Sequence, residues 1–420
     1  MSSSKTIWYV SKYVAPPQGE SVGGRGYELM RELAALGHTC VIVTSDANHL
    51  AETPTLTEPV LVQQRDGLSV HWLRTFKAAT AKSWQRIVSW LHFEWRLSRL
   101  DTSKLPAPDA VIVSSLSLLT VVNGLVLKRR HRTRLVFEVR DIWPLTLVEE
   151  GGFTPANPLV RALGMVERLG YRRADVIVGT MPALGKHVRE VLGEEREVHC
   201  IPMGFSGRAI PDEPAPEPPA ARSAGGPMVV GYAGTVGITN ALESFLEAAR
   251  SLRDEPGIRF VVIGDGPLLA SFKEQYADVG SVSFVPKVPK DRVAAELDTC
   301  DLLYLSTYPS KVWEFGQSLN KLIDYMMSGR PILASFSGHH SMINEADCGS
   351  FVPAGDTDAV VAELRRYAAM PPEERAAIGA RGRTWLLEHR SYERLARDYH
   401  EILFPGTSLP GVGVEHSSSA

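Results

Sequence analysis

The sequence predicts an α/β protein made of two doubly wound domains, each with a largely parallel sheet covered by helices. Three observations support this class. The chain has 420 residues, which is too long for one ordinary core and suggests two domains of roughly 200 residues each. Short apolar strands alternate with helical segments along most of the sequence. The alternation stops at a stretch rich in proline and alanine, residues 208–227, and then begins again.

The first half, residues 1–207, contains apolar runs with the length of buried strands and amphipathic segments between most of them. Residues 26–36 and 160–172 are the clearest helices. Because a helix between two strands lets them run in parallel, we expect these runs to form one sheet. The predicted strands are residues 6–10, 39–44, 110–114, 134–139, 176–179 and 199–202.

The second half repeats this architecture over residues 228–385, without a visible repeat of sequence. Residues 208–227 are expected to be a linker, and the tail, residues 406–420, is expected to be disordered. The predicted strands are residues 228–232, 259–263, 282–285, 302–305, 331–334 and 349–352.

The composition argues against several classes of function. A net charge of -3 implies neither nucleic acid nor an acidic polymer as a partner. Cys40, Cys200, Cys300 and Cys348 are scattered, so neither a metal site nor a disulfide framework is expected. A reducing cytoplasm fits this pattern. The polar start of the chain lacks the basic start and long apolar core of a signal peptide.

Two segments bear on membrane contact. Residues 110–127 carry no charge, but they contain several serines and are shorter than the roughly 20 apolar residues that cross a bilayer, so a buried strand and helix are favoured. Residues 81–100 combine three tryptophans with basic residues at helical spacing. Such a helix suits a membrane interface, and a core helix with a basic outer face explains it equally well.

Ligands in doubly wound sheets bind beyond the carboxyl ends of the strands. Gly23 and Gly24 precede a predicted helix, where a glycine pair lets backbone amides approach an anion; a plain loop is the alternative. Arg140 and Asp141 follow a predicted strand and place a charged pair at the edge of the sheet; a local salt bridge is the alternative there.

Glycine-rich turns follow the first two strands of the second half. Gly231, Gly234 and Gly237 have the spacing GxxGxxG, which permits close approach to a phosphate but differs from the dinucleotide fingerprint GxGxxG. Gly264 and Gly266 form a second turn, which a tight turn alone would also explain.

The stretch FGQSLNKLIDYMMSGRPILAS, residues 315–335, carries the strongest signal. Helical spacing places Lys321 and Asp324 one turn apart on one face, and apolar neighbours indicate a largely buried helix. Buried charges need a partner or a ligand. A nucleoside diphosphate would satisfy both, because the lysine and the helix start can hold the phosphates while the carboxylate accepts hydrogen bonds from the ribose. A surface ion pair is the alternative.

Four stretches, GGRGYELMRELAALGHTCVIVTSD, VFEVRDIWP, YAGTVGITNALESF and FGQSLNKLIDYMMSGRPIL, together resemble family 4 of the retaining glycosyltransferases. The resemblance is closest to the branch that builds bacterial surface polysaccharides, and it covers residues 6 to about 405. It implies the GT-B fold, in which two Rossmann-like domains face each other across a cleft. It also implies that residues 386–405 form a final helix that returns to the N-terminal domain.

The resemblance implies roles by position. Asp324 resembles the second acid of the family's E-x7-E motif, which binds the donor ribose, and Gly316 stands at the first. Thr235 and Asn240 stand where many members have a basic clamp for the diphosphate, so we expect Lys321, Lys290 or Lys287 to replace it. The expected nucleotide-sugar-binding residues are Gly234, Thr235, Gly264, Gly266, Val288, Lys290, Gly316, Ser318, Asn320, Lys321 and Asp324; the catalytic residues are Arg140, Asp141 and Lys321; the acceptor-binding residues are Gly23, Gly24 and Arg25.

The function implied is retaining, metal-independent transfer of a sugar from a UDP-sugar. The sugar is expected to be an N-acetylated amino or deoxy sugar, and the acceptor a glycan or a polyprenyl-diphosphate-linked sugar. The enzyme is expected in the cytoplasm, in peripheral contact with the inner face of the plasma membrane through residues 81–100. Two alternatives stay open: a nucleotide-sugar 2-epimerase of the same fold, and a non-catalytic subunit that binds nucleotide sugars.

Overall fold

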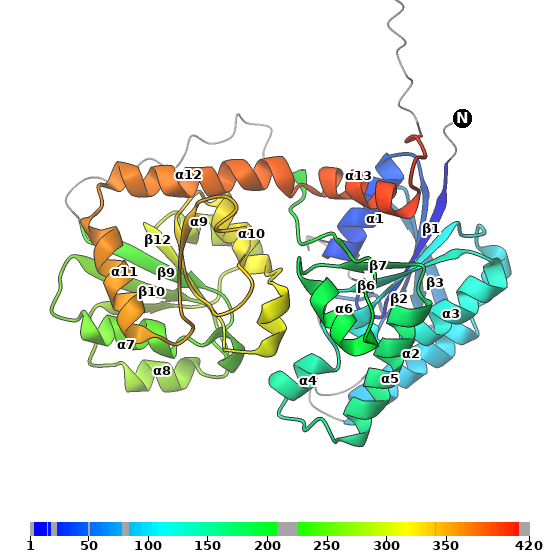
Figure 1. Cartoon of the computed structure of the whole chain (residues 1–420), viewed down its shortest axis with the longest axis horizontal. Helices are drawn as coiled ribbons and strands as arrows, with labels where there is room; N and C mark the ends of the chain where they lie inside the picture. The colour runs from blue at the N-terminus through cyan, green and yellow to red at the C-terminus, as the bar shows by residue number, and fades with distance from the viewer. Residues whose placement is uncertain are drawn as a thin grey trace, which may run out of the picture. The chain divides into compact units, whose positions relative to one another are not determined.

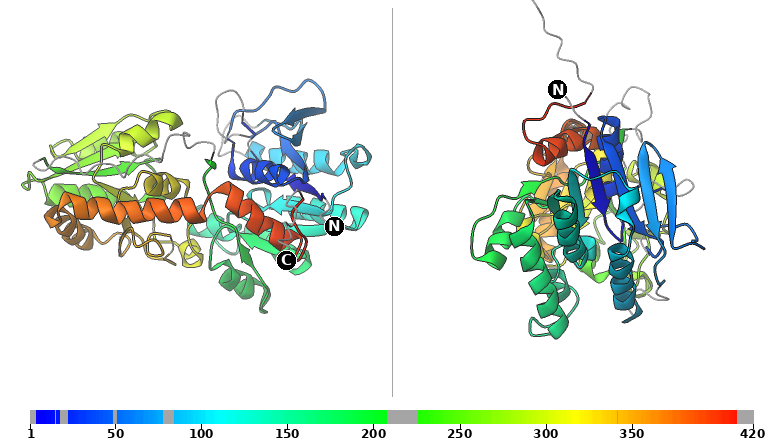
Figure 2. Two further views of the ribbon diagram at one scale, coloured as in Figure 1. Left: turned by 90° about the horizontal axis from the view of Figure 1, so that it is seen from above. Right: turned by 90° about the vertical axis from the view of Figure 1, so that its right-hand side faces the viewer.

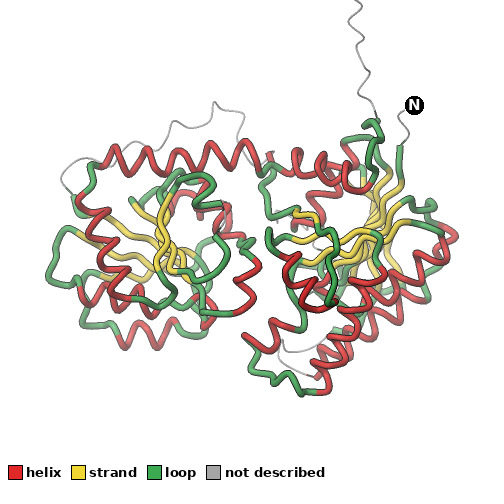
Figure 3. Tube along the Cα trace, in the orientation of Figure 1, coloured by secondary structure: helices red, strands yellow, loops and turns green. Residues whose placement is uncertain are grey.

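The computed structural model describes residues 4–14, 16–17, 23–48, 51–77, 84–207, 226–340 and 342–410. The chain divides into two compact units: Met1–Ser206 with Tyr392–Ala420 form unit 1, and Gly207–Ser391 form unit 2. Each unit contains a sheet with helices packed on it (Figures 1 and 2). In Figure 3 the strands of each unit, in yellow, lie between helices in red. Two α/β domains with doubly wound sheets are present, and the predicted fold class is therefore confirmed.

The sheet of unit 1 has eight strands in the order β3-β4-β2-β1-β5-β6-β7-β8. β1 pairs with β2 on one side and β5 on the other, so the direction of winding changes at β1. All residues of β5 are buried, which explains its continuous apolar run between two helical layers. The strands are β1 (Thr6–Val10), β2 (Thr39–Ser45), β3 (Val60–Arg65), β4 (Leu68–Leu73), β5 (Ala110–Ser114), β6 (Arg134–Val139), β7 (Val176–Gly179) and β8 (His199–Cys200).

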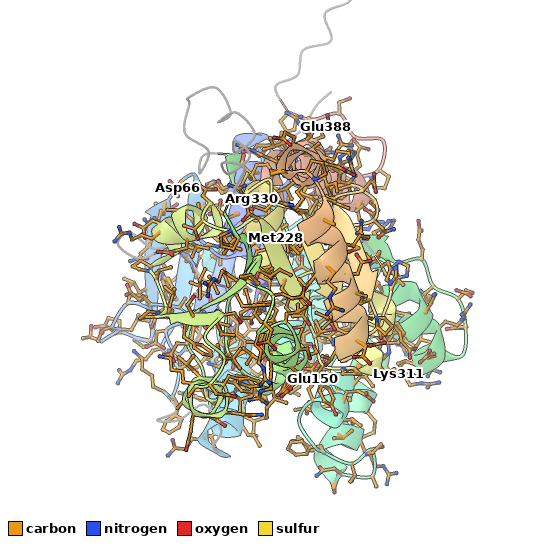
Figure 4. All side chains as sticks on the ribbon, turned by 90° about the vertical axis from the view of Figure 1, so that its left-hand side faces the viewer. Asp66, Glu150, Met228, Lys311, Arg330 and Glu388 are labelled. Carbon is orange, nitrogen blue, oxygen red and sulfur yellow. The ribbon has the colours of Figure 1, made fainter. Side chains whose placement is uncertain are left out.

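The prediction missed the hairpin of β3 and β4 at the edge of this sheet. β3 pairs antiparallel with β4, and Asp66, labelled in Figure 4, lies in the turn between them. Asp66 and Gly67 both have positive φ values, 49° and 76°. An Asp-Gly pair with this conformation is the preferred two-residue hairpin turn, so the sequence did carry a signal for the hairpin. The sheet of unit 1 is consequently mixed rather than fully parallel.

The helices of unit 1 come from both ends of its chain. The final helix α13 packs beside α1, as Figures 1 and 2 show. The predicted helix of residues 386–405 is two helices, because α12 (Pro372–His389) ends in unit 2 and α13 (Tyr392–Leu403) belongs to unit 1. The helices are α1 (Arg25–Ala35), α2 (Trp84–Ser98), α3 (Thr120–His131), α4 (Leu145–Glu149), α5 (Pro158–Arg173), α6 (Leu184–Leu192) and α13.

Unit 2 has a six-stranded parallel sheet in the order β11-β10-β9-β12-β13-β14. β9 is flanked by β10 and β12, so the winding changes direction at its first strand, as it does in unit 1. The strands are β9 (Met228–Ala233), β10 (Ile258–Ile263), β11 (Val282–Val285), β12 (Leu302–Ser306), β13 (Ile332–Ser335) and β14 (Gly349–Val352); the helices are α7 (Glu243–Ser251), α8 (Leu269–Gln275), α9 (Val293–Leu297), α10 (Asn320–Met327), α11 (Thr357–Ala369) and α12.

Several expectations concern residues outside the described ranges. The linker lies almost entirely outside them, as do the first residues of segment 81–100 and most of the expected disordered tail. Residues 110–127 form β5 and the greater part of α3, as predicted. In the described ranges, every helix is too short or too polar to cross a membrane.

Two hydrogen-bonded histidines, His38 and His400, link α13 to the start of unit 1 through Lys5. Nδ1 of His38 accepts a hydrogen bond from the backbone N–H of Lys5 at 3.2 Å, and its Nε2 lies 3.0 Å from Nδ1 of His400. Nε2 of His400 lies 2.8 Å from the carbonyl oxygen of Thr407. Because that oxygen can only accept, His400 donates to it and accepts from His38. The arrangement therefore requires both rings to be neutral.

The hydrogen bonds of His38 and His400 predict a loss of stability in acid. Burial, followed by the charge of His400, lowers the pKa of His38 to about 4, while Asp109 raises it and Lys5 lowers it. The unfolded chain takes up this proton near pH 6.5. The neutral His38 ring therefore contributes fully to the free energy of unfolding above about pH 6.5. This contribution is lost as the pH falls toward 4, which lowers the free energy of unfolding by about 2 kcal/mol.

Urea unfolding between neutral pH and about pH 4 measures this effect when wild type is compared with His38→Gln, which cannot take up the proton. As the pH is lowered, the free energy of unfolding is expected to fall more steeply for wild type than for the variant. If the free energy of unfolding has the same slope against pH in wild type and variant, the hydrogen-bonded histidines do not control the docking of α13.

Candidate active site

Two glycine turns of unit 2 pack against each other at the carboxyl ends of β9 and β10. The backbone N–H of Gly234 donates to the carbonyl oxygen of Ile263 at 2.9 Å. The N–H of Val236 donates to the backbone carbonyl oxygen of Asp265, also at 2.9 Å. A Cβ atom on Gly264 would lie 1.9 Å from the carbonyl oxygen of Gly234. Gly234 and Gly264 also have φ values of 151° and 150°, which other residues rarely adopt. Both glycines are therefore required for this loop packing, whatever they bind.

Lys321 lies at the start of α10 and reaches back to the first of these turns. Its Nζ donates to the hydroxyl of Tyr232 at 3.0 Å and to Oδ1 of Asn240 at 2.5 Å, and it lies 4.6 Å from the centre of the Tyr232 ring. A Cβ atom on Gly234 would be 3.2 Å from the same nitrogen. The structure thus brings together Lys321, the glycine turn and Asn240, which the family resemblance had linked to diphosphate binding.

The electrostatics of Lys321 differ from those of an ordinary surface lysine. Within the described ranges, no carboxylate lies at ion-pair distance from its Nζ. Burial lowers the pKa of the ammonium group to about 8. The helix start beside it has no side-chain cap, because its N-cap residue is Leu319. A half-buried cation next to uncapped helix amides is a favourable environment for an anion.

Asp324 does not share a partner with Lys321. Its two carboxylate oxygens accept hydrogen bonds from Nζ of Lys290 at 2.6 and 2.5 Å. The side chains of Lys290 and Asp324 are 62% and 30% exposed, so this is a surface ion pair of small net energy. Both residues were predicted to bind the donor, and a ribose at Asp324 would compete with or lie beside this pair.

The segment between the short helix Lys311–Phe315 and α10 holds the remaining predicted donor-binding residues. Gly316 has a φ of 112° and its N–H donates to Trp313 at 3.1 Å. Ser318 is half-buried and Asn320 is exposed, as is Thr235 in the glycine turn, while Val288 is half-buried in the loop after β11. These residues belong to loops that follow the carboxyl ends of the strands of unit 2, where ligands of doubly wound sheets bind.

Gln317 in this segment was missed by the sequence analysis. It is 2% exposed, and its amide nitrogen and oxygen lack hydrogen-bond partners among the described residues. A buried amide without partners costs about 1–3 kcal/mol for each group, so a polar side chain at this position needs a reason such as a ligand. No pattern in the sequence distinguishes Gln317, because glutamine in a loop is usually exposed.

Arg140 and Asp141 follow β6 in unit 1, and the side chain of Ser115 orders their backbone. The hydroxyl of Ser115 accepts from the N–H groups of Arg140 and Asp141 at 3.0 and 3.1 Å and donates to the carbonyl of Asp141 at 2.8 Å. The carboxylate of Asp141 accepts from Nε1 of Trp143 at 2.7 Å and from the hydroxyl of Thr146 at 2.8 Å. Asp141 thus stabilises its own loop, while Arg140 lies half-buried beside it.

Gly23, Gly24 and Arg25 lie at the start of α1, but Arg25 turns into the core. Its Nη1 donates to Glu138 at 2.7 Å, and its other nitrogens donate to the carbonyls of Ile201 and Pro202 at 2.5 and 3.1 Å. Arg25 is 2% exposed. Its guanidinium group is therefore occupied by structural contacts, and the two glycines remain the accessible part of the predicted acceptor site.

Metal ligands can be searched for by their clustering. In the part of the chain that the structure describes, no group of three or more His, Cys, Asp or Glu residues could hold a metal ion. Independence from metal remains a prediction for the assays below.

Two protein-family models match the chain. The Glycosyl transferase 4-like domain matches residues 23–204, and the Glycosyl transferases group 1 model matches residues 227–369. The two matches fall in unit 1 and unit 2, respectively. No curated protein matches the chain in sequence.

Solved structures resemble the chain over nearly all of its length. Sucrose-phosphate synthase from Thermosynechococcus elongatus is 16% identical with a TM-score of 0.66, covering 95% of this chain and 98% of that one. A trehalose-6-phosphate protein from E. coli, bound with UDP-2-fluoro glucose, is 12% identical with a TM-score of 0.70 and the same coverage. WaaG, a glycosyltransferase involved in lipopolysaccharide biosynthesis, is 16% identical with a TM-score of 0.63, covering 95% and 100%. With a glycosyl transferase 4-like domain in unit 1, a group 1 domain in unit 2 and this fold, the chain belongs to the glycosyltransferases of the GT-B type.

Proposed function

We propose that this protein transfers a sugar from a UDP-sugar to a glycan or lipid-linked acceptor, with retention of the anomeric configuration and without a metal ion, in the synthesis of a cell-surface polysaccharide. The observation that carries the proposal is Lys321: a half-buried lysine whose ammonium group has a lowered pKa and no carboxylate among its described neighbours, at an uncapped helix start beside a glycine turn. A diphosphate supplies the negative charge that this group lacks.

The chemistry follows from this charge. As the bond between the sugar and the diphosphate breaks, negative charge develops on the leaving phosphate oxygen. Lys321 and the amides at the start of α10 would stabilise that charge, and the same oxygen would take the proton of the acceptor hydroxyl. Positive charge from the protein would thereby take the place of a metal ion.

The other predicted donor residues support this arrangement. Asp324 would accept hydrogen bonds from the ribose hydroxyls, with Lys290 held beside it. The buried amide of Gln317 would gain partners from the hydroxyls of the bound sugar. One similar solved structure is bound with UDP-2-fluoro glucose, and WaaG acts in lipopolysaccharide biosynthesis; both favour a UDP-sugar and a surface glycan. On this proposal unit 1 holds the acceptor, and the enzyme works at the inner face of the plasma membrane.

A panel of UDP-sugars tests the proposal. One of them is expected to raise the unfolding temperature, since a ligand at 100 times its Kd adds about 2.7 kcal/mol. With that donor and a cell extract of glycans or lipid-linked sugars, UDP release should require acceptor and persist in EDTA. The new glycosidic linkage should have the same anomeric configuration as the sugar in the donor.

The same assay separates the alternatives. Release of UDP with epimerised sugar and without acceptor would establish the 2-epimerase. Donor binding with no turnover toward any acceptor would establish a binding subunit, and an inverted linkage would refute retention.

A further inference from the structure

A basic hollow lies on unit 1, at the edge of the sheet opposite Arg140 and Asp141. It has a volume of about 990 Å³ and is formed by the end of α3, the start of β6 and the segment from α5 to β7. Arg134 begins β6 and Arg140 follows its end, so the strand separates them by about 20 Å. The charged residues of the hollow are Lys128, Arg129, Arg132, Arg134, Arg173 and Asp175.

The positive charge of the hollow is only partly compensated. Asp175 accepts a hydrogen bond from Lys128 at 2.6 Å and is the one acid against five cations. The helix dipole accounts for cations in the last turns of α3 and α5. It does not account for Arg134, which lies at the start of a strand.

A buried hydroxyl in the hollow points to a ligand. Thr133 is 6% exposed and lines the hollow between Arg132 and Arg134. Its Oγ1 lacks a hydrogen-bond partner among the described residues. A buried hydroxyl without a partner, flanked in the sequence by two arginines that also line the hollow, would be satisfied by the oxygen of an anion such as a phosphate.

The helices around the hollow expose apolar side chains in a regular pattern. α2 packs on α3 and α3 packs on α5, so the three helices form one layer of unit 1. Each carries an exposed apolar pair four residues apart, which lie on one face of the helix. The pairs are Leu91 (55% exposed) and Trp95 (47%), Val122 (46%) and Val126 (57%), and Met165 (68%) and Leu169 (37%).

We propose that this layer docks on a membrane containing anionic phospholipid, and that the basic hollow takes one phosphate-bearing headgroup. Exposed apolar residues normally occur singly on soluble proteins, whereas three such pairs on the helices of one layer, two of which border a cationic hollow, have the composition of an interfacial surface. The chain as a whole has a net charge of -3, so attraction to an anionic membrane depends on this local concentration of cations. The inference extends the membrane contact proposed for residues 81–100 and rests on it in part, but it does not depend on the transfer reaction.

Sedimentation with vesicles of phosphatidylcholine, with and without phosphatidylglycerol, tests the inference on the full chain. We expect binding that requires phosphatidylglycerol and weakens at high salt. Reversing three cations of the hollow, in Arg129→Glu with Arg132→Glu and Arg173→Glu, is expected to weaken it about 100-fold. The double variant Val126→Asp with Leu169→Asp is expected to weaken vesicle binding at both low and high salt, because salt does not screen the apolar contact.

The matched control reverses three exposed cations of unit 2, in Arg253→Glu with Arg259→Glu and Lys273→Glu. This variant has the same net charge as the hollow variant and should keep most of the vesicle binding. Both variants should unfold cooperatively, in the absence of nucleotide, at a temperature close to that of wild type, which confirms folding without relying on the proposed function.

Three outcomes would overturn the inference. Equal losses in the hollow and control variants would show that only net charge matters. Stabilisation by glycerol phosphate without vesicle binding would assign the hollow to a free phosphate instead of a membrane. Failure to bind phosphatidylglycerol vesicles at low salt would remove the docking surface.

Discussion

Lys321→Met is expected to slow sugar transfer by a factor of about 100 or more at saturating donor, because it removes the ammonium group proposed to stabilise the leaving diphosphate. Methionine keeps the apolar stem of the side chain against Tyr232 while abolishing the charge. The initial rate of UDP release in the presence of acceptor measures the effect. The variant should unfold at no lower temperature than wild type, since a half-buried cation without a counter-ion among the described residues is itself destabilising.

The matched control for this prediction is Lys273→Met, which removes an exposed lysine from α8 of the same unit and should leave the rate unchanged. Turnover in Lys321→Met within a few-fold of wild type would refute the role of Lys321.

The pH dependence of UDP binding gives an independent check. A diphosphate binds the charged form of Lys321, whose pKa is lowered to about 8 by burial. Affinity for UDP should therefore be highest below pH 8 and fall as the pH rises through that value, and Lys321→Met should lose this dependence.

Arg25→Met is expected to lower the free energy of unfolding of unit 1 by about 3–5 kcal/mol, because it leaves the carboxylate of Glu138 buried without its counter-ion. Both side chains of this pair are 0% exposed. Glu138 also accepts hydrogen bonds from Tyr9 and, at 3.4 Å, from Tyr399 of α13, so the ion pair joins α1, β6 and the final helix. Urea unfolding followed by tryptophan fluorescence measures the loss.

Two further variants make this prediction specific. Arg189 and Glu195 are also 2.7 Å apart in unit 1, but their side chains are 56% and 72% exposed, so Arg189→Met should cost less than about 1 kcal/mol. Arg25→Met combined with Glu138→Gln should recover a large part of the lost stability, since no unpaired charge remains. Wild-type stability in Arg25→Met with a raised KM for acceptor would instead support the acceptor-binding role first predicted for Arg25.

Most central strands of the two sheets could be predicted because their residues are buried on both faces. Such strands are continuous apolar runs, and β1, β5 and β12 were located within a residue of their ends for this reason. β3 was missed because it lies at the edge of its sheet, where its residues are exposed or half-buried and its pattern is weak. The break between α12 and α13 was missed because no proline or glycine separates the two helices.

The site could be predicted as a set of residue types but not as a set of contacts. The glycine turns and Lys321 were recognised, and the structure shows that they meet at the end of β9. The ion pair of Lys290 and Asp324 joins residues 34 positions apart, and helical spacing had suggested Lys321 as the nearer charge to Asp324. Arg25 was recognised as a basic residue at a helix start, but its direction into the core depends on Glu138, which lies 113 positions away.

The sequence by itself determined the two-domain α/β architecture and the positions where phosphate chemistry is expected, because periodicity, glycine turns and strand ends are local properties of the chain. The tertiary structure decided which charges are paired, which are buried alone and which surfaces stay exposed. Those properties depend on solvation and on contacts between residues distant in sequence. For this reason the charge of Lys321 without a counter-ion among the described residues, the core position of Arg25 and the basic hollow of unit 1 could be seen only in the folded structure.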